Sequence, residues 1–547
     1  MALKQFLKKL FLFNIPSVTE DFILKDNKQN IAYDVRTDNL YPPPQEKVSA
    51  NIDENLSYIK KRYSYPENSD IVIREFRVGI EERRTFIFFI DGMAEGNVIN
   101  LSVIQPMIEL SHLDKNSKIT SIDDIADKFI WHGQTEKTNL MDTIIDQVNF
   151  GGCGVFIDGF DYAFSLDIKG WEHRGINKPE NEQSIYGPQE AFGEMLRTNT
   201  ALVRKFVKDE RLICEMHKVG SKSKTATVVM YIKELANENL VEEVRNRVDG
   251  VDMDYIISSE ELSLMIEEKT FMLTSQILAT ERPDRVARAL SEGRVAIIMN
   301  GSPRALILPT NSFELTHSPS DAYMRLPYSN MTRIVRYIAM FISILLPALY
   351  LSVTLFHREL IPTYLLYSIS ASRENVPFPS IFEMFLMELC FEIIREASIR
   401  TPGPIGSTLG IVGGLILGQA AVSARIVSPI MIIIVAVTGI GSFATTDYSL
   451  GWTYRILRII FMILASVCGF FGIALGIFVY SVFLAAQKSF GVPFLSPLAE
   501  GDKNAFHGSL FLSPIWKNEQ RPKFLSPQDD IQEPKISRKW KKKRKSK

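Results

Sequence analysis

The sequence predicts an α/β soluble N-terminal region of two subdomains, followed by an all-α polytopic membrane domain. Two observations carry this prediction. Residues 1 to about 325 mix charged positions with β-rich runs, whereas residues 334–490 are strongly apolar. Within the apolar region, four charge-free windows are bounded by charged residues: 337–357, 401–424, 426–446 and 459–487. A helix needs about 20 apolar residues to cross a bilayer, so each window is long enough to span.

Residues 1–50 predict an amphipathic N-terminus and a linker. Lys4, Lys8 and Lys9 precede the apolar run at 10–13, which is too short for a signal peptide. We therefore expect an amphipathic helix that lies on a membrane surface or docks on the chain's own domain. The three prolines at 42–44 predict an extended linker after it.

Two soluble subdomains are expected at residues 51–165 and 190–315. Three β-rich runs, at 84–92, 154–159 and 294–301, each end in Asp-Gly or Asn-Gly, which favours a tight turn. A second strand-like run follows the last two, so we expect two hairpins there, whereas the first runs into a helix at 99–110. The remaining expected elements are a strand at 225–232 and helices at 235–248 and 282–291.

Nothing in this half has the pattern of an enzyme. The glycine-rich residues 151–154 precede a strand and lack both the dinucleotide and the phosphate-loop patterns. The histidines have no metal-ligand spacing. The cysteines are far apart and form no CxxC pair, which favours four buried reduced thiols: Cys153, Cys214, Cys390 and Cys468. We expect no catalytic residue, no metal and no cofactor.

Small residues mark the helices of the apolar half. Gly406, Gly410, Gly414 and Gly418 recur at every fourth position, and a second pair is formed by Gly472 and Gly476. Such a stripe on a helix lets another helix approach closely, backbone to backbone. The spacing predicts helix packing or assembly, and it fits contacts within one chain as well as contacts between chains.

Residues 360–399 differ from the other windows, and we expect a re-entrant or interfacial segment. Glu388, Glu392 and Glu396 lie four residues apart and therefore share one helical face. In one interpretation the helix is interfacial, with Glu392–Arg395 and Glu396–Arg400 ion pairs. In the other, the acids form a cation path, because carboxylates repeated around an oligomer make rings that select cations.

The region 491–547 ends in a basic tail. Residues 535–547 carry nine basic residues and no acid, so the tail should stay cytoplasmic and can lie on anionic lipid. Nucleic acid is disfavoured as a partner because no aromatic stacking platform accompanies the tail. With both termini inside, an even number of crossings is needed, and four fit. Arg455 and Arg458 would then lie outside, which conflicts with the positive-inside rule.

Several segments resemble the A subunits of the GerA-type spore germinant receptors. The most specific is Ile411-Val-Gly-Gly-Leu-Ile-Leu-Gly-Gln-Ala-Ala-Val; the others include Glu359-Leu-Ile-Pro-Thr, Val376-Pro-Phe-Pro, Glu392-Ile-Ile-Arg-Glu-Ala and Ser489-Phe-Gly-Val-Pro. The resemblance covers about residues 50–500. Asn300-Gly301 stands where an Asp-Gly turn would be expected.

The resemblance implies a multi-pass subunit in the spore inner membrane, with transporter-like B-type and lipoprotein C-type partners. Such receptors sense nutrients and trigger spore germination with release of monovalent cations, and the A subunit is thought to form a homo-oligomeric, nutrient-gated ion channel. A non-conducting scaffold or signal-relay subunit is the alternative. A secondary transporter is disfavoured because residues 334–490 show no internal sequence repeat.

Overall fold

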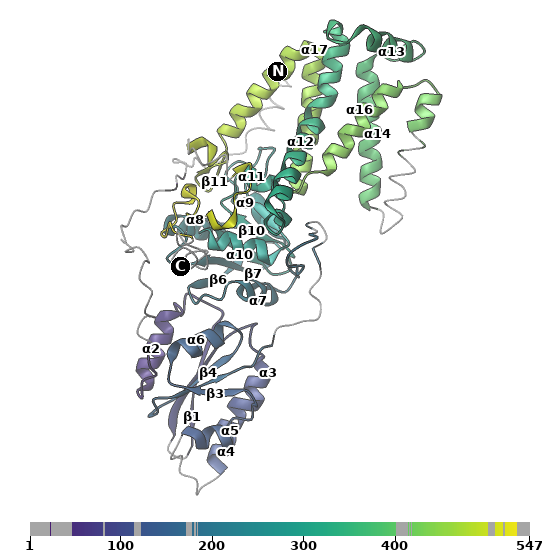
Figure 1. Ribbon diagram of the computed structural model, residues 1–547. Coiled ribbons are helices and arrows are strands. Elements are labelled where there is room, and N and C mark those ends of the chain that lie inside the picture. Colours follow the sequence, from purple (N-terminus) through teal and green to yellow (C-terminus); the bar gives the residue numbers. More distant parts are fainter. Residues whose placement is uncertain are drawn as a thin grey trace, which may run out of the picture.

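The computed structural model shows an elongated chain in which two sheet-containing subdomains precede a bundle of helices (Figure 1). It describes Phe22, Leu24 and residues 46–532 apart from 80–81, 114–121, 171–177, 180–181, 183, 401–413, 415, 417, 501–508 and 518–519. The expected N-terminal helix, Gly406, Gly410 and the basic residues 535–547 lie outside this description.

Subdomain 1, residues 52–166, is a five-stranded antiparallel sheet in the order β1-β2-β4-β5-β3. Its strands are β1 (Ile71–Val78), β2 (Arg83–Ile90), β3 (Thr135–Thr138), β4 (Cys153–Ile157) and β5 (Ala163–Leu166). Its helical segments are α2 (Ile52–Arg62), α3 (Gly96–Ile99), the π-helix η1 (Asn100–Ile104), α4 (Gln105–Leu113), α5 (Ile122–Phe129) and α6 (Met141–Asn149). Successive residues of β2 point to opposite faces, so Phe86 and Phe88 join a core under α2 and α6 while Ile87 joins one under α3 to α5.

Subdomain 2, residues 196–316, repeats this topology in the order β6-β7-β9-β10-β8. Its strands are β6 (Leu212–Val219), β7 (Thr225–Ile232), β8 (Leu278–Thr280), β9 (Val295–Met299) and β10 (Ala305–Leu308). Its helices are α7 (Leu196–Phe206), α8 (Glu238–Asp249), α9 (Ser259–Ile266), α10 (Pro283–Ser291) and α11 (Ser312–Thr316). The predicted hairpins are confirmed as the antiparallel pairs β4–β5 and β9–β10, and the predicted strand at 225–232 is β7.

A buried ion pair joins the two subdomains. Arg204 on α7 donates to both carboxylate oxygens of Asp70, at 2.6 and 2.8 Å, and also to the side chain of Asn68. Arg204 is 2% exposed and Asp70 is fully buried. Since both charges are removed from water, each depends on the other for its stabilisation.

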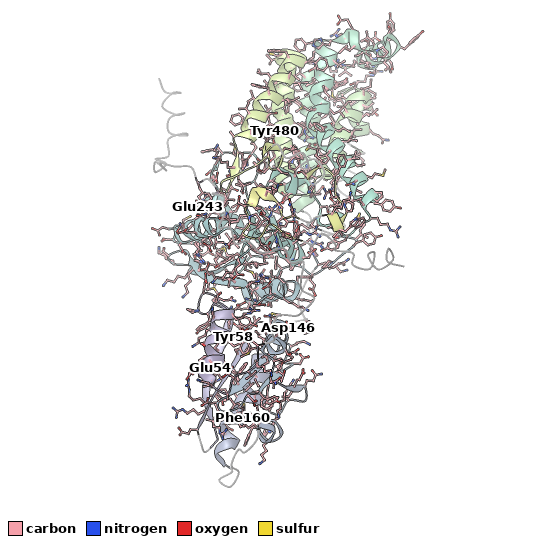
Figure 2. All side chains as sticks on the ribbon, turned by 60° about the vertical axis from the view of Figure 1, so that its left-hand side comes forward. Glu54, Tyr58, Asp146, Phe160, Glu243 and Tyr480 are labelled. Carbon is pink, nitrogen blue, oxygen red and sulfur yellow. The ribbon has the colours of Figure 1, made fainter. Side chains whose placement is uncertain are left out.

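The C-terminal half is helical, which confirms the predicted fold class. The bundle contains α12 (Leu326–Leu355), α13 (Thr363–Arg373), α14 (Ser380–Arg400), α16 (Pro429–Phe443) and α17 (Tyr448–Ala485), and residues 418–423 are also helical. Among the described residues, Leu326–Leu355 and Ser449–Ala485 are long and apolar enough to cross a membrane, and Pro429–Phe443 is a shorter apolar helix. Figure 2 shows Tyr480 in the bundle, Glu243 on subdomain 2 and Phe160 on subdomain 1.

The predicted span over residues 459–487 is not one straight helix, because α17 folds back at Gly469. This glycine has φ 60° and ψ −140°, which L-residues with a side chain rarely adopt. A Cβ atom placed on Gly476 would lie 2.7 Å from the ring of Phe461. Fifteen residues of straight helix would separate these two residues by roughly 22 Å. Residues 448–468 and 470–485 therefore form two antiparallel limbs.

The region expected to be re-entrant or interfacial contains a long continuous helix. α14 has 21 residues and packs beside α12 and α16 without turning back. The chain reaches it through the short helix α13 at the end of the bundle that is far from subdomain 2 (Figure 1). The first limb of α17 begins at subdomain 2, where Thr453 bonds to the carbonyl of Leu273. Arg455 and Arg458 therefore lie toward the subdomain 2 end of the bundle.

The four cysteines are free thiols, but not all are buried as the sequence suggested. Cys153 and Cys214 are buried in the two sheets, Cys390 is half-buried and Cys468 is exposed. Cys468 lies at the tip of the α17 hairpin, next to Gly469, where few other groups can cover it.

Candidate ion path and its arginine partners

Two of the three acids predicted for the cation path meet arginines of α17. The carboxylate of Glu388 lies 3.1 Å from Nη2 of Arg458. Glu392 lies 3.1 Å from the same nitrogen and 3.3 Å from Nη1 of Arg455. Glu396, one turn further along α14, is exposed. The geometry thus brings two acids and two bases into one cluster.

Helical spacing explains why four side chains converge. Glu388 and Glu392 are four residues apart on α14, while Arg455 and Arg458 are three apart on α17, so each pair occupies one face of its helix. Glu388 is 5% exposed and Arg458 is 1% exposed. Charges this deeply buried require partners, and the cluster supplies equal numbers of both signs.

The expected Glu392–Arg395 pair is wrong. Glu392 turns instead to the α17 arginines, whereas the guanidinium of Arg395 lies 5.1 Å from the ring centre of Phe443. The tertiary partner prevails because α17 presents two buried guanidiniums that need a carboxylate. The side chain of Arg400, expected to pair with Glu396, lies outside the described side chains.

The cluster retains unused hydrogen-bonding capacity. Among the described residues, no partner is found for Oε1 of Glu388, Nη2 of Arg455, or Nε and Nη1 of Arg458, and all four atoms are buried. An unpaired buried polar atom costs about 1–3 kcal/mol. The cluster can therefore gain stability from water, an ion or a group of another subunit.

A fourth acid of α14 was missed from the sequence. Glu383 is fully buried, lies 3.3 Å from Arg373 of α13 and accepts a 3.0 Å hydrogen bond from the backbone N–H of Ser428. It precedes Glu388 by five residues and so falls outside the four-residue spacing that marked the other acids. Its contacts fix the far end of the bundle, where α13, α14 and the start of α16 meet.

Subdomain 2 holds both the entry to and the exit from the bundle. At the entry, Arg336 of α12 donates a 3.3 Å hydrogen bond to the carbonyl of Thr316, the last residue of subdomain 2, and the buried Asp321 just beyond it pairs with Arg333 and Arg336. At the exit, Thr274 donates a 2.6 Å hydrogen bond to Gln487, just after α17. One apolar core runs from the α7 and α10 side of subdomain 2 into the bundle. A displacement of subdomain 2 would therefore act on α12 and α17 together.

The described glycines of the small-residue stripes have different surroundings. Gly472 and Gly476 lie inside the α17 hairpin, against Leu464 and Phe461 of the other limb. A Cβ on Gly418 would make ordinary contact with Ile432, at 3.8 Å, and one on Gly414 would meet no described atom within 4 Å. The second pair thus packs within the chain, while Gly414 faces away from it.

Comparison with known proteins places the chain in a family. The model of the Bacillus/Clostridium GerA spore germination protein matches residues 57–524. The chain belongs to the GerA family. This GerA protein is 38% identical to spore germination protein KA of Bacillus subtilis (strain 168), over 90% of each chain. It is 31% identical to spore germination protein GerLA of Bacillus cereus, over 89% of this chain and 98% of that protein.

A solved structure is also similar to this GerA protein. It is the N-terminal domain of the A subunit of the Bacillus megaterium spore germinant receptor GerK3, at 28% identity and a TM-score of 0.37. The match covers 49% of this chain and 98% of that domain. Within the described residues, no group of three or more His, Cys, Asp or Glu side chains could hold a metal ion. The predicted resemblance to germinant receptor A subunits is confirmed by the family match and the relatives.

Proposed function

We propose that this GerA protein is a subunit of a nutrient germinant receptor in the spore inner membrane, where it forms part of an oligomeric, nutrient-gated cation channel. Its N-terminal region and C-terminal tail face the spore core. Its partners are a transporter-like B-type subunit, a lipoprotein C-type subunit, further copies of the chain and membrane lipid. Family membership supports the receptor role, and the acid–arginine cluster between α14 and α17 carries the channel proposal.

In this proposal, the cation path is closed when Glu388 and Glu392 are paired with the arginines of α17. A carboxylate can attract a cation only when it is not already neutralised, and Arg455 and Arg458 neutralise Glu388 and Glu392 in this structure. Moving α17 away from α14 would free the carboxylates of Glu388 and Glu392. Subdomain 2 contacts both ends of α17. A displacement of subdomain 2 would therefore move α17 relative to α14.

Assembly with further copies involves the outward glycine face. A Cβ atom on Gly414 would meet no described atom within 4 Å, and a small residue on an apolar helix permits close approach of another helix. We expect Gly406 and Gly410 to belong to the same contact, because they share its four-residue spacing. Gly418 is instead buried and faces Ile432 of α16 within the chain.

Substitution of the acids tests the path. We expect spores carrying Glu388→Gln together with Glu392→Gln to lose most of the early potassium release after nutrient addition. The matched control is Glu374→Gln, which removes an exposed carboxylate on the same half of the chain. Unchanged potassium release at a normal protein level would overturn the role of these acids.

A scaffold or signal-relay subunit is the second candidate, and the pairing of the acids within the chain favours it. In that case the cluster is a structural tie and no ions pass through the chain. A planar bilayer recording separates the two candidates. Cation currents from the purified full-length protein would identify a channel. Absence of current in the presence of the partner subunits and nutrient would support the relay.

A further inference from the structure

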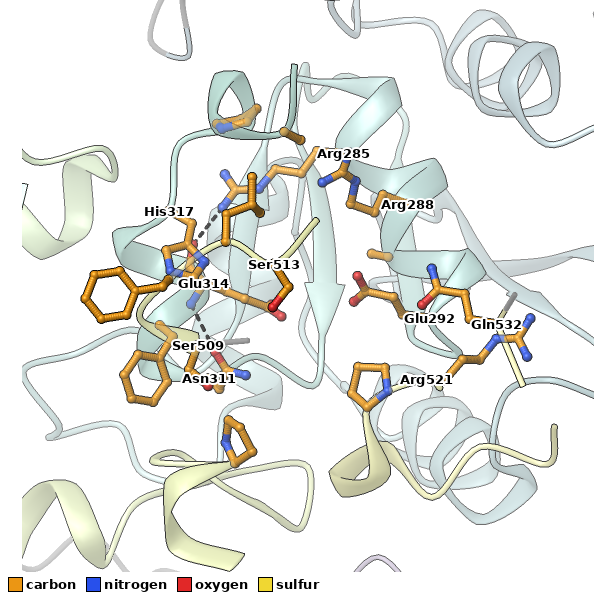
Figure 3. A pocket seen from close by; sticks show the side chains of 18 of the residues that line it. Arg285, Arg288, Glu292, Asn311, Glu314, His317, Ser509, Ser513, Arg521 and Gln532 are labelled. Atoms are coloured by element: carbon orange, nitrogen blue, oxygen red, sulfur yellow. Dashed lines mark hydrogen bonds between the residues drawn. The ribbon is translucent and has the colours of Figure 1, made fainter. Parts of the chain in front are cut away.

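A large cavity lies outside the helical bundle, where three parts of the chain meet. Its volume is about 1070 Å³, and its walls come from α10 and α11 of subdomain 2, the first turns of α12 and the C-terminal stretches 509–517 and 520–532. Figure 3 shows Arg285 and Arg288 on one side of it and Ser509 and Ser513 on another. The volume is in the range of sites that enclose small organic ligands.

The walls of this cavity carry an excess of positive charge. Among the described lining residues, seven are cationic and three are acidic: Arg285, Arg288, Arg294, Arg333, Lys517, Arg521 and Lys523 against Asp284, Glu292 and Glu314. Part of the positive charge is compensated locally, since Arg285 pairs with Glu182 and Arg294 pairs with Glu314. Arg333 and Arg521 also have acidic partners, Asp321 and Asp529. Among the described residues, Arg288, Lys517 and Lys523 are the lining cations for which no ion pair is found.

Two buried nitrogens in the wall have no hydrogen-bond partner among the described residues. One is Nη1 of Arg333, a side chain that is 5% exposed and shares the single carboxylate of Asp321 with Arg336. The other is Nε2 of His317. Burial, together with the positive charge of Arg333, lowers the pKa of His317 to about 3, so the ring is neutral and offers a polar nitrogen without a charge.

Further cations line the mouth. Arg288 on α10 and Lys517 on the C-terminal segment are exposed and make no ion pair among the residues that the structure describes. Guanidinium groups bind carboxylates and phosphates through paired, charge-assisted hydrogen bonds. Phe313 and Phe511 add apolar surface to the wall, which suits the body of an organic molecule.

We propose that this cavity binds a small organic anion through its carboxylate or phosphate group, with Arg288, Lys517 and Arg333 as the recognising side chains. The bound anion bridges subdomain 2, the base of α12 and the C-terminal segment. The site goes beyond the proposed function, because it lies outside the α14–α17 path and does not depend on ion conduction.

Titration calorimetry on the full chain purified in detergent tests the proposal, with inorganic phosphate and benzoate as separate probes. We expect saturable binding of at least one probe, weakened about tenfold or more by Arg288→Gln and again by adding Lys517→Gln. The control is Arg325→Gln, which removes an exposed guanidinium nearby that does not line the cavity, and it should leave binding unchanged. Unchanged thermal unfolding shows that the variants are folded.

A lipid headgroup carries the same phosphate group as a free anion. A second experiment therefore distinguishes a bound lipid from a bound free anion. Native mass spectrometry compares retention of phosphatidylglycerol and phosphatidylcholine by the chain and by Arg288→Gln. Phosphatidylglycerol lost selectively in the variant assigns the site to a lipid phosphate, whereas binding of the soluble probes alone assigns it to a free anion. Absence of saturable binding for both probes and both lipids, or equal weakening by Arg325→Gln, overturns the proposal.

Discussion

Subdomains 1 and 2 share one strand order but differ in what their helices cover. In subdomain 1, both faces of the sheet are closed by the subdomain's own helices. In subdomain 2, the core under α7 and α10 continues into the helical bundle, and the exit from α17 returns to it. The comparison teaches that the same topology stays outside the helical bundle in subdomain 1 and forms the base of that bundle in subdomain 2.

Breaking the buried ion pair between subdomains 1 and 2 should have the largest effect on the stability of the chain. Arg204→Met leaves the buried Asp70 without its partner, which costs about 3–5 kcal/mol. We expect faster hydrogen exchange in subdomain 1 (residues 52–166) than in subdomain 2 (residues 196–316), measured on the purified chain. Arg197→Met is the control, since its pair with Asp91 also joins α7 to subdomain 1 but is 37% and 45% exposed. An equal effect of both variants would contradict the importance of the buried pair.

The ion pairs of Asp321 with Arg333 and Arg336 of α12 provide the corresponding test at the entry to the bundle. Asp321→Asn removes the charge shared by Arg333 and Arg336, and we expect a loss of about 1.5–3 kcal/mol. Because subdomain 2 and the bundle share one core, both should lose hydrogen-exchange protection together while subdomain 1 does not. Loss of protection confined to α12 would show that the shared core does not couple them.

Two glycine substitutions separate packing within the chain from packing between chains. Gly476→Leu forces a side chain into Phe461. We expect it to lower the free energy of unfolding in detergent by about 1–3 kcal/mol. Gly414→Leu meets open space, so it should leave the single chain's stability unchanged and weaken the oligomer on native gels. An intact oligomer of Gly414→Leu would remove that face from the proposed assembly.

The smallest effect is expected at a half-buried contact between the two subdomains, made by Glu67. Burial opposes ionisation of Glu67, but hydrogen bonds from Tyr231 and Lys233 prevail and lower its pKa below the ordinary 4.5. The folded state therefore binds this proton less tightly than the unfolded state, and the stabilisation is present above pH 4.5 and lost as the pH falls through the lowered value. Glu67→Gln should cost at most about 1 kcal/mol at pH 7, and chemical denaturation should show the difference shrinking in acid.

The candidate site was only partly predictable. The acid row of α14 was visible because a four-residue spacing puts Glu388 and Glu392 on one face of any helix. Their partners were not, since Arg455 and Arg458 lie more than sixty residues away and appeared only as a conflict in the expected membrane topology. Glu383 was missed because its role depends on Arg373 and a backbone N–H that packing alone brings near.

The sequence by itself determined the local elements. Asp-Gly and Asn-Gly turns specify the hairpins β4–β5 and β9–β10, and the long apolar runs specify helices, because both depend on neighbouring residues. Tertiary structure alone decided the reversal at Gly469, the acid–arginine cluster and the cationic cavity. A glycine permits a left-handed backbone without requiring it, and a buried charge takes the partner that packing supplies, so these features follow from contacts between segments far apart in the chain.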